Sequence, residues 1–203
     1  MRIAVVTLCV GDEYTCLVSD GIRNKRAYCD RHGYAFVCER VHLADTRPIP
    51  WSKLPLIKRV LPQYDVVFFS DADVMIMNFA VKLEAFIDKL FESDKLVMVS
   101  RDFNGINTGN MFLRNDSRTM AMMDQVYERE EFTHHDWWEQ AAFIHMYDTN
   151  STFRSHVQVV RSEIFNAYEH NFKVGFFLVH FASYQGPKLR EAMKLYGRIS
   201  DAI

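Results

Sequence analysis

The sequence lacks any block of like charges, and acidic and basic side chains nearly balance at 26 and 24, for a formal charge of -2. Proteins that bind nucleic acid or a membrane surface through electrostatics typically carry basic patches or runs of like charge. Long apolar runs are absent as well, and the apolar N-terminal run is too short to span a bilayer, which takes about 20 such residues. We therefore expect neither a nucleic-acid partner nor a membrane span.

Cysteine is scarce, and Cys9, Cys16, Cys29 and Cys38 form neither a CxxC pair nor a zinc-like spacing. This pattern favours reduced thiols and a cytoplasmic protein. No small-residue cleavage site follows the apolar N-terminus, so we interpret it as a strand and expect no secretory leader or anchor. Repeats, low-complexity segments and linkers are also missing, which favours one domain over residues 1–203.

What the sequence does have is an alternation of strand-like and helix-like segments. An apolar run at 2–8 is followed by a helical pattern at 19–32, with Ser19 as a candidate N-cap, and by a strand at 34–41. Such a start favours a mostly parallel sheet with helices on both faces. Further helices are expected at 51–61, 80–91, 116–130, 136–147 and 187–197, and further strands at 66–70, 95–100, 157–160 and 174–181, with a loop leading into a strand over 105–115.

The segment VVFFSDADVMIMN places Asp71 and Asp73 directly after a strand that reads as buried. Ligands of open α/β sheets bind beyond the carboxyl ends of strands, and side chains two apart in an extended segment point the same way. Two such carboxylates can hold Mg²⁺ or Mn²⁺ and leave coordination positions for substrate phosphates. The simpler alternative is a turn with a helix cap, because aspartate favours both.

A second alternative is a phosphatase resembling the haloacid dehalogenase superfamily, in which a nucleophilic Asp and an acid/base Asp follow a strand. Thr or Val normally stands two residues after that pair, where this sequence has Met75. A late paired-acid loop for magnesium is also missing. The metal site is therefore the favoured interpretation.

Six segments occur in the order found in one known enzyme family, namely NKRAYCDRHGY, PWSKLPLIKRVL, FFSDADVMIMN, INTGNMFLRN, WWEQAAF and VHFASYQGPK. On these segments the chain resembles GT-A nucleotide-sugar glycosyltransferases, and within them family 34, the galactosyl-, xylosyl- and mannosyltransferase group. The resemblance implies a Rossmann-like GT-A fold, and a virus-encoded member similar to the chlorella-virus enzymes that glycosylate capsid protein would fit it.

The resemblance also implies a metal and a donor. Asp71 and Asp73 would bind Mn²⁺ that bridges the donor diphosphate, with His180 as the third ligand. An imidazole nitrogen beside carboxylates independently favours Mn²⁺ over Mg²⁺, which stays an alternative. The donor would be a nucleoside diphosphate sugar, with uridine preferred to guanosine.

Further donor contacts follow from the same resemblance. Tyr14, in the loop where such enzymes hold the base, would stack on a uracil or else be packed into the protein. Lys188, at a helix start, would balance charge on the leaving diphosphate or else be a solvated surface lysine. Gly109 suits a tight turn beside the sugar pocket. The full set of donor-binding candidates is Thr7, Cys9, Tyr14, Lys53, Asp71, Asn107, Thr108, Gly186 and Lys188.

The catalytic candidates lie at the start of one expected helix. Glu139 and Gln140 match an acidic-Gln pair that such enzymes place near the reacting carbon, and Asp136 is the alternative carboxylate. Their simpler interpretation is the exposed side of an amphipathic helix. Trp137 and Trp138 would form an acceptor-binding rim, although one of the two is expected in the core.

These features together predict a Mn²⁺-dependent glycosyltransferase that moves a sugar from the donor to a hydroxyl of a glycan or glycoprotein. The metal would act as a Lewis acid on the departing diphosphate. Retention follows from the resemblance alone, so front-side attack, a covalent intermediate and inversion all stay open. A nucleotide-sugar binding module without transferase activity is the alternative from a different class, and the phosphatase is another.

Overall fold

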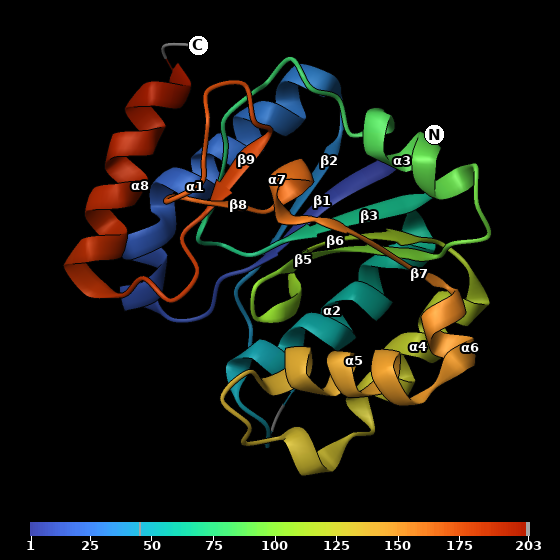
Figure 1. Cartoon of the computed structure of the whole chain (residues 1–203). Helices are drawn as coiled ribbons and strands as arrows, with labels where there is room; N and C mark the ends of the chain where they lie inside the picture. Colours follow the sequence, from blue (N-terminus) through green and yellow to red (C-terminus); the bar gives the residue numbers. More distant parts are fainter. Residues whose placement is uncertain (45, 202–203) are drawn as a thin grey trace.

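The computed structural model describes residues 1–44 and 46–201, and its centre is a six-stranded sheet of order β2-β1-β3-β6-β5-β7 (Figure 1). Neighbouring strands pair in parallel except at β6, which is antiparallel to both β3 and β5. The expected mixed, mostly parallel α/β sheet is therefore confirmed. Its strands are β1 (Ile3–Leu8), β2 (Ala35–Glu39), β3 (Val66–Ser70), β5 (Val97–Asp102), β6 (Gly105–Arg114) and β7 (Val157–Arg161).

Helices cover both faces of this sheet (Figure 1). Along β3, Val67 and Phe69 pack into a core shared with α2, α4, α5 and α6, while Val66 and Phe68 pack toward α1, α3 and α7. Both faces of β3 are buried, which explains its unbroken apolar sequence. The helices are α1 (Asp12–His32), α2 (Lys53–Val60), α3 (Glu84–Phe91), α4 (Ser117–Tyr127), α5 (Trp138–Thr149), α6 (Ser151–Ser155), α7 (Ser162–Phe165) and α8 (Gly186–Asp201), with short 3-10 turns at Ile49–Ser52, Leu61–Gln63 and Glu130–Phe132.

None of the described helices combines the length and the apolar character that crossing a membrane requires.

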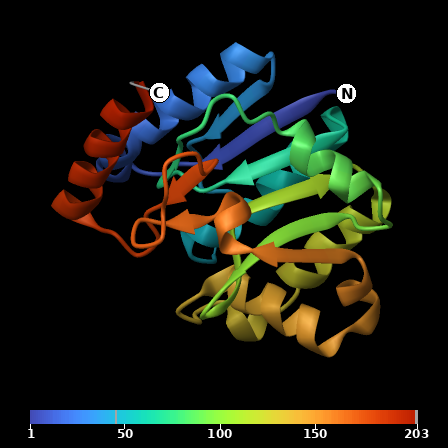
Figure 2. The same ribbon diagram turned by 45° about the horizontal axis from the view of Figure 1, so that its top comes forward.

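A second, three-stranded sheet lies beside the first and was not expected from the sequence. It has the order β4-β9-β8, formed by β4 (Val74–Ile76), β9 (Leu178–His180) and β8 (Ala167–Tyr168). In Figures 1 and 2, β8 and β9 lie near α1 and α8. The antiparallel pairing of β4 with β9 sets Val74 opposite His180. The small sheet thus joins the chain just after the aspartate pair to a segment near the C-terminus.

Several expected element boundaries are wrong, and the following three lie in elements that position the site. The first helix begins at Asp12 rather than at Ser19. Gly11, with φ +92, is the N-cap residue after β1, and the acidic side chains of Asp12 and Glu13 stabilise the first turn through the helix dipole. The segment expected as a loop before a strand is β-strand throughout, with a register shift opposite it after Val99. The last strand is only three residues long, because Gly175 with φ +95 lies in a turn within the expected strand.

Candidate active site

A cavity of about 820 Å³ lies beyond the carboxyl ends of β1 and β3, where an open α/β sheet binds its ligands. Both sheets and α5 contribute to its wall. The residues that the sequence singled out and that the structure brings together on this wall are Tyr14, Lys53, Asp71, Asp73, Asn107, Asp136, Trp137, Trp138, Glu139, Gln140 and His180. Segments from residue 14 to residue 180 therefore converge on one cavity.

Asp71, Asp73 and His180 form a cluster in which one ligand atom of each lies within 4.8 Å of the others. The Nε2 atom of His180 is 3.4 Å from Oδ1 of Asp73. On the other side of the ring, Nδ1 is 2.9 Å from the amide oxygen of Asn166. Because an amide oxygen only accepts, Nδ1 carries a proton, and Nε2, on the side of the carboxylates, is the nitrogen left to bind a metal ion. This donor set fits a divalent cation that takes mixed oxygen and nitrogen ligands.

Gly109 of β6 leaves room for this cluster. A Cβ atom there would lie 2.5 Å from Cε1 of His180 and 2.7 Å from Oδ2 of Asp71. The backbone of the strand itself helps to hold the aspartate, since the amide of Asp71 donates to the carbonyl of Gly109 at 2.7 Å. Gly109 is therefore explained by the close approach of the Asp71 and His180 side chains and not by the tight turn expected from the sequence.

A buried ion pair lies next to the cluster. Nζ of Lys53 donates to Oε1 of Glu139 at 2.6 Å and to the carbonyl of Thr108 at 3.2 Å, and it lies 3.5 Å from Oδ1 of Asp71. Glu139 is 4% exposed, so its interpretation as the outer face of an amphipathic helix is wrong. Burial alone would lower the pKa of Lys53, but Asp71 and Glu139 hold that pKa above its ordinary value.

The helix start that carries Glu139 is tied to β6 by a second contact. Gln140 accepts through Oε1 from the backbone amide of Thr108 at 3.1 Å, and the Thr108 hydroxyl donates to Glu139 at 3.3 Å. The second carboxylate oxygen of Glu139, Oε2, is buried and has no hydrogen-bond partner among the described residues. A buried acceptor without a partner is unusual in a folded protein, and a ligand hydroxyl or a water molecule that reached it would satisfy it.

The pKa values of the ionisable groups in and near the cluster shift in different directions. Burial raises the pKa of Asp71 to about 6, with Lys53 opposing this and Asp73 adding to it. Burial acts in the same direction on Asp73, but the charge and hydrogen bond of His180, the charge of Lys25 and a backbone hydrogen bond together hold the pKa of Asp73 below its usual value. Burial and the two aspartates raise the pKa of the Tyr14 hydroxyl, which therefore stays a neutral donor at neutral pH.

Five of the predicted donor contacts do not line the cavity. One of them is Thr108, which is buried and contacts Glu139 and Gln140 instead. Thr7 and Cys9 are fully buried, and the residues that reach the cavity from this segment are Leu8 and Val10. Burial in the core is incompatible with side-chain contact to a nucleotide, and this part of the prediction is corrected accordingly.

Gly186 and Lys188 are the other two predicted contacts outside the wall. Gly186 begins α8 with φ +50, and Lys188 is exposed with its Nζ 3.7 Å from the centre of the Tyr184 ring. Tyr184 does line the cavity. Lys188 therefore contacts Tyr184, which lines the cavity, but does not line the cavity itself.

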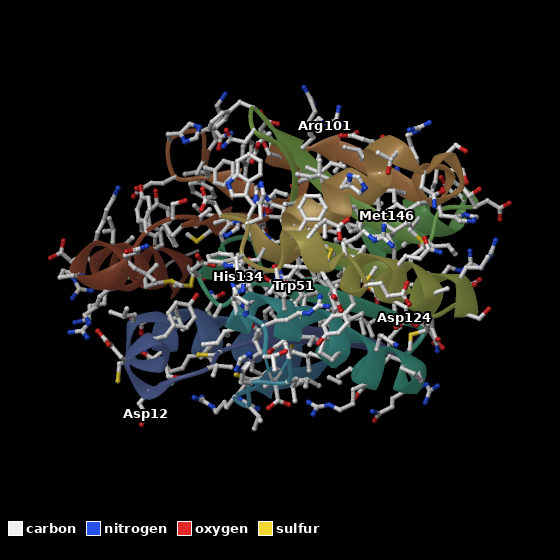
Figure 3. The ribbon with its side chains drawn as sticks, turned by 90° about the horizontal axis from the view of Figure 1, so that it is seen from below. Asp12, Trp51, Arg101, Asp124, His134 and Met146 are labelled. Atoms are coloured by element: carbon white, nitrogen blue, oxygen red, sulfur yellow. The ribbon has the colours of Figure 1, made fainter. Side chains whose placement is uncertain are left out.

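The segment before α5 forms one side of the cavity mouth. Trp137 and Trp138 are 43% and 40% exposed, so the expectation that one of them is in the core is wrong. The helix begins at Trp138, whose φ of +42 turns the chain sharply, and Asp136 precedes it in an exposed position. Buried Trp51 holds this segment by donating from Nε1 to the carbonyl of Thr133 at 3.2 Å, close to the labelled His134 in Figure 3.

Sequence reasoning missed several residues that support the site. The hydroxyl of Tyr168 accepts from Nδ2 of Asn107 at 3.1 Å and donates to the carboxylate of Asp102, while its ring stacks on His180 at 5.9 Å. Asn166 orients His180 as described above. Each contact joins segments far apart in the chain, so no local pattern could have pointed to them.

Solved structures with the same architecture identify the class of fold. A glycosyltransferase involved in the glycosylation of the major capsid of PBCV-1 has a TM-score of 0.80 to this chain, at 17% identity, and the match covers 96% of this chain and 100% of that one. The Streptococcus pneumoniae TIGR4 glycosyltransferase GlyE has a TM-score of 0.58 at 12% identity, covering 100% of this chain and 63% of its own. The chain has the fold of GT-A glycosyltransferases.

The sequence comparisons then identify the family. Residues 2–92 and 88–186 match the model of the galactosyl transferase GMA12/MNN10 family, and the chain belongs to that family. An alpha-1,2-galactosyltransferase of Schizosaccharomyces pombe is 26% identical over 207 residues, covering 79% of this chain and 54% of the relative. Xyloglucan 6-xylosyltransferase 2 of Arabidopsis thaliana is 29% identical over 123 residues, covering 57% of this chain and 26% of the relative. The chain thus spans about half the length of the Schizosaccharomyces pombe relative and about a quarter of the Arabidopsis thaliana relative.

Proposed function

We propose that residues 1–203 form a glycosyltransferase domain that moves a sugar from a nucleoside diphosphate sugar to a hydroxyl of a glycan or glycoprotein. The observation that carries this proposal is the cluster of Asp71, Asp73 and His180 on the wall of the 820 Å³ cavity. A cavity of this size matches the usual range for small-molecule sites, about 300–1,000 Å³. Membership of a galactosyltransferase family supports sugar transfer as the reaction.

Asp71, Asp73 and His180 would hold Mn²⁺, with Mg²⁺ as the alternative. When bound, the cation supplies Lewis-acid stabilisation of the charge on the departing diphosphate. Uridine is the preferred base of the donor, with Tyr14 on the cavity wall as a candidate to stack on it. The neutral hydroxyl of Tyr14 also offers a hydrogen-bond donor near the carboxylates of Asp71 and Asp73.

Lys53 and Glu139 would position the donor. The ammonium of Lys53, between Asp71 and Glu139, fixes both carboxylates and adds positive charge where the diphosphate would lie. A carboxylate paired this closely with a protonated lysine is a weak nucleophile, so we assign Glu139 to binding a sugar hydroxyl through its free Oε2. Of the catalytic candidates taken from the sequence, exposed Asp136 is then the remaining carboxylate on the cavity wall.

The acceptor would bind at the aromatic mouth of the cavity. Every Phe or Trp side chain that is exposed in the described part of the chain, namely Phe103, Trp137 and Trp138, lines this cavity. Exposed aromatic groups concentrated at one place mark a binding surface, and their flat faces suit the apolar faces of a sugar ring. The left-handed backbone of Trp138 is strain of the kind that clusters at functional sites.

A thermal-shift panel tests the proposal directly. UDP, GDP, CDP and ADP are each added with Mn²⁺, with Mg²⁺ and with EDTA, and binding to the native state must raise the Tm. We expect a shift with UDP that needs Mn²⁺. No shift with any nucleotide contradicts the site assignment.

Turnover separates the three classes of function. With a UDP-sugar and an acceptor glycan, a transferase releases UDP and forms a glycosylated product. Nucleotide binding without UDP release indicates the binding module. Release of inorganic phosphate from a phosphomonoester, without nucleotide affinity, indicates the phosphatase.

A further inference from the structure

The turn that carries the two aspartates, residues 71–73, lies directly against helix α1. The contact begins at Gly21, where a Cβ atom would lie 2.8 Å from the carbonyl oxygen of Ala72 and 3.1 Å from that of Val74. These distances are shorter than the ordinary separation of packed atoms, so the helix backbone meets the turn with no side chain between them. Any larger residue at this position must push the turn away.

Lys25, one helical turn further on, donates to the same two carbonyl groups. Its Nζ lies 2.6 Å from the oxygen of Val74 and 3.4 Å from that of Ala72, and the side chain is fully buried. These two carbonyls flank Asp73 on either side along the chain. A buried ammonium is tolerated only when it is hydrogen-bonded, and here the backbone of the turn provides the acceptors.

A third residue of α1 holds the strand that follows the turn. The side-chain amide of Asn24 accepts from the backbone amide of Ile76 at 2.7 Å and donates to its carbonyl at 2.9 Å. Asn24 therefore replaces the missing neighbour on the free edge of β4, whose other edge pairs with β9 and His180. The turn and β4 are fixed between a helix on one side and the strand with the third ligand on the other.

We propose that Gly21 and Lys25 form an anchor that fixes the turn so that Asp71 and Asp73 face His180, and that Lys25 is a positioning residue for metal binding. The anchor acts through the backbone carbonyls of Ala72 and Val74. The proposal rests on the metal site assigned under the proposed function. It goes beyond that site because neither Gly21 nor Lys25 lines the cavity or ligates the metal.

A purely electrostatic role for Lys25 predicts the opposite sign. If its charge served only to offset the two aspartates, removing it would strengthen the binding of another cation at that place. If Lys25 is an anchor, removing it releases the turn and weakens cation binding. The direction of the change in Mn²⁺ affinity therefore decides between the two roles.

The test measures Mn²⁺ binding by the EPR signal of the free ion, at a temperature where each variant is fully folded by circular dichroism. Lys25→Met keeps the apolar stem and removes the charge, and Gly21→Ala keeps every charge and displaces the turn. We expect the Kd for Mn²⁺ to rise by about 10–100-fold in both, as for other groups that orient metal ligands. The control is Gly197→Ala in α8, where the new Cβ lies 3.8 Å or more from its neighbours and the Kd should stay unchanged.

The outcomes separate the anchor from the proposed function. Wild-type protein that binds no Mn²⁺ overturns the metal site and the anchor together. Wild-type protein that binds Mn²⁺, with an unchanged or lower Kd in both variants, overturns the anchor alone. If Lys25→Met fails to fold, Gly21→Ala decides by itself, because its charges are those of the wild type. Loss of global stability alone leaves the Kd of a folded protein unchanged, so a raised Kd supports the anchor.

Discussion

Replacing Gly109 by alanine adds one methyl group at the centre of the candidate metal site. The new Cβ would lie 2.5 Å from Cε1 of His180, 2.7 Å from Oδ2 of Asp71 and 2.9 Å from Oδ1 of Asn107. Packed carbon atoms sit at about 3.5–4.0 Å, so the His180 ring must move by about 1 Å. Metal-ligand distances tolerate only about 0.2 Å. We therefore expect the variant to lose Mn²⁺ affinity by at least the roughly 10–100-fold typical of misoriented ligands.

The same variant should also lose stability, even though glycine is usually the weaker choice inside a strand. Gly109 does not have a positive φ, so alanine fits the backbone there and would stabilise an unobstructed strand by about 0.5–1 kcal/mol. Overpacking a buried position costs about 1–3 kcal/mol, which outweighs that gain. The expected net effect is a fall of up to about 2.5 kcal/mol in the free energy of unfolding.

Calorimetric titration with UDP and Mn²⁺, paired with urea unfolding in EDTA, measures the two effects separately. Gly197→Ala in α8 is the matched control, because its Cβ would make only ordinary contacts, 3.8 Å to Met75 and 4.0 Å to Asp20, and the substitution should stabilise the protein by about 0.5–1 kcal/mol. Wild-type nucleotide affinity in Gly109→Ala, with Mn²⁺ still required, would refute the arrangement of Asp71 and His180 around a shared ion.

Three further predictions follow from individual side chains. Asp73→Asn should keep the fold by circular dichroism but lose the Mn²⁺-dependent UDP shift, and full activity without added metal would contradict the site. Because Glu139 is assigned to binding a sugar hydroxyl, Glu139→Gln should raise the KM for the donor more than it lowers kcat; a fall in kcat at unchanged KM would contradict that role and place Glu139 at the reacting carbon in preference to Asp136. Asp116 caps α4 by accepting from the amide of Arg118 at 2.8 Å, so Asp116→Ala should cost about 1 kcal/mol in urea unfolding at pH 7. Hydrogen bonds from Arg118 lower the pKa of Asp116 to about 2, so this stabilisation should be complete above about pH 4 and disappear as the pH falls through about 2; a difference from wild type that persists unchanged at low pH would argue against the cap.

The central sheet could be predicted from the sequence because its strands carry strong local patterns. The run before Asp71 is apolar on both faces, as a central strand requires, and Gly33 ends α1 in the left-handed conformation expected of a helix stop. The position of Asp71 and Asp73 at the carboxyl end of that strand follows from the same pattern. These parts depend on residues close together in the chain.

The remainder of the site depends on pairing between segments that are distant in the sequence, so it could not be predicted from local sequence patterns. β4 and β8 are three and two residues long, too short to give a periodic signal, yet they bring His180 to the aspartates. Lys25 lies in a segment that reads as an ordinary charged helix, and its full burial appears only once the turn packs against it. Glu139 reads as a surface residue until Lys53, 86 positions earlier, pairs with it.

The pairing of β4 with β9 also determines when during synthesis a competent site can exist. A nascent chain that has emerged only as far as β6 already contains Asp71, Asp73 and Gly109, and it still lacks both His180 and Asn166. Closing contacts of such long sequence separation is slow and comes late in folding. Partly synthesised chains therefore carry an incomplete candidate metal site, and the proposed site can form only after the C-terminal strands have paired.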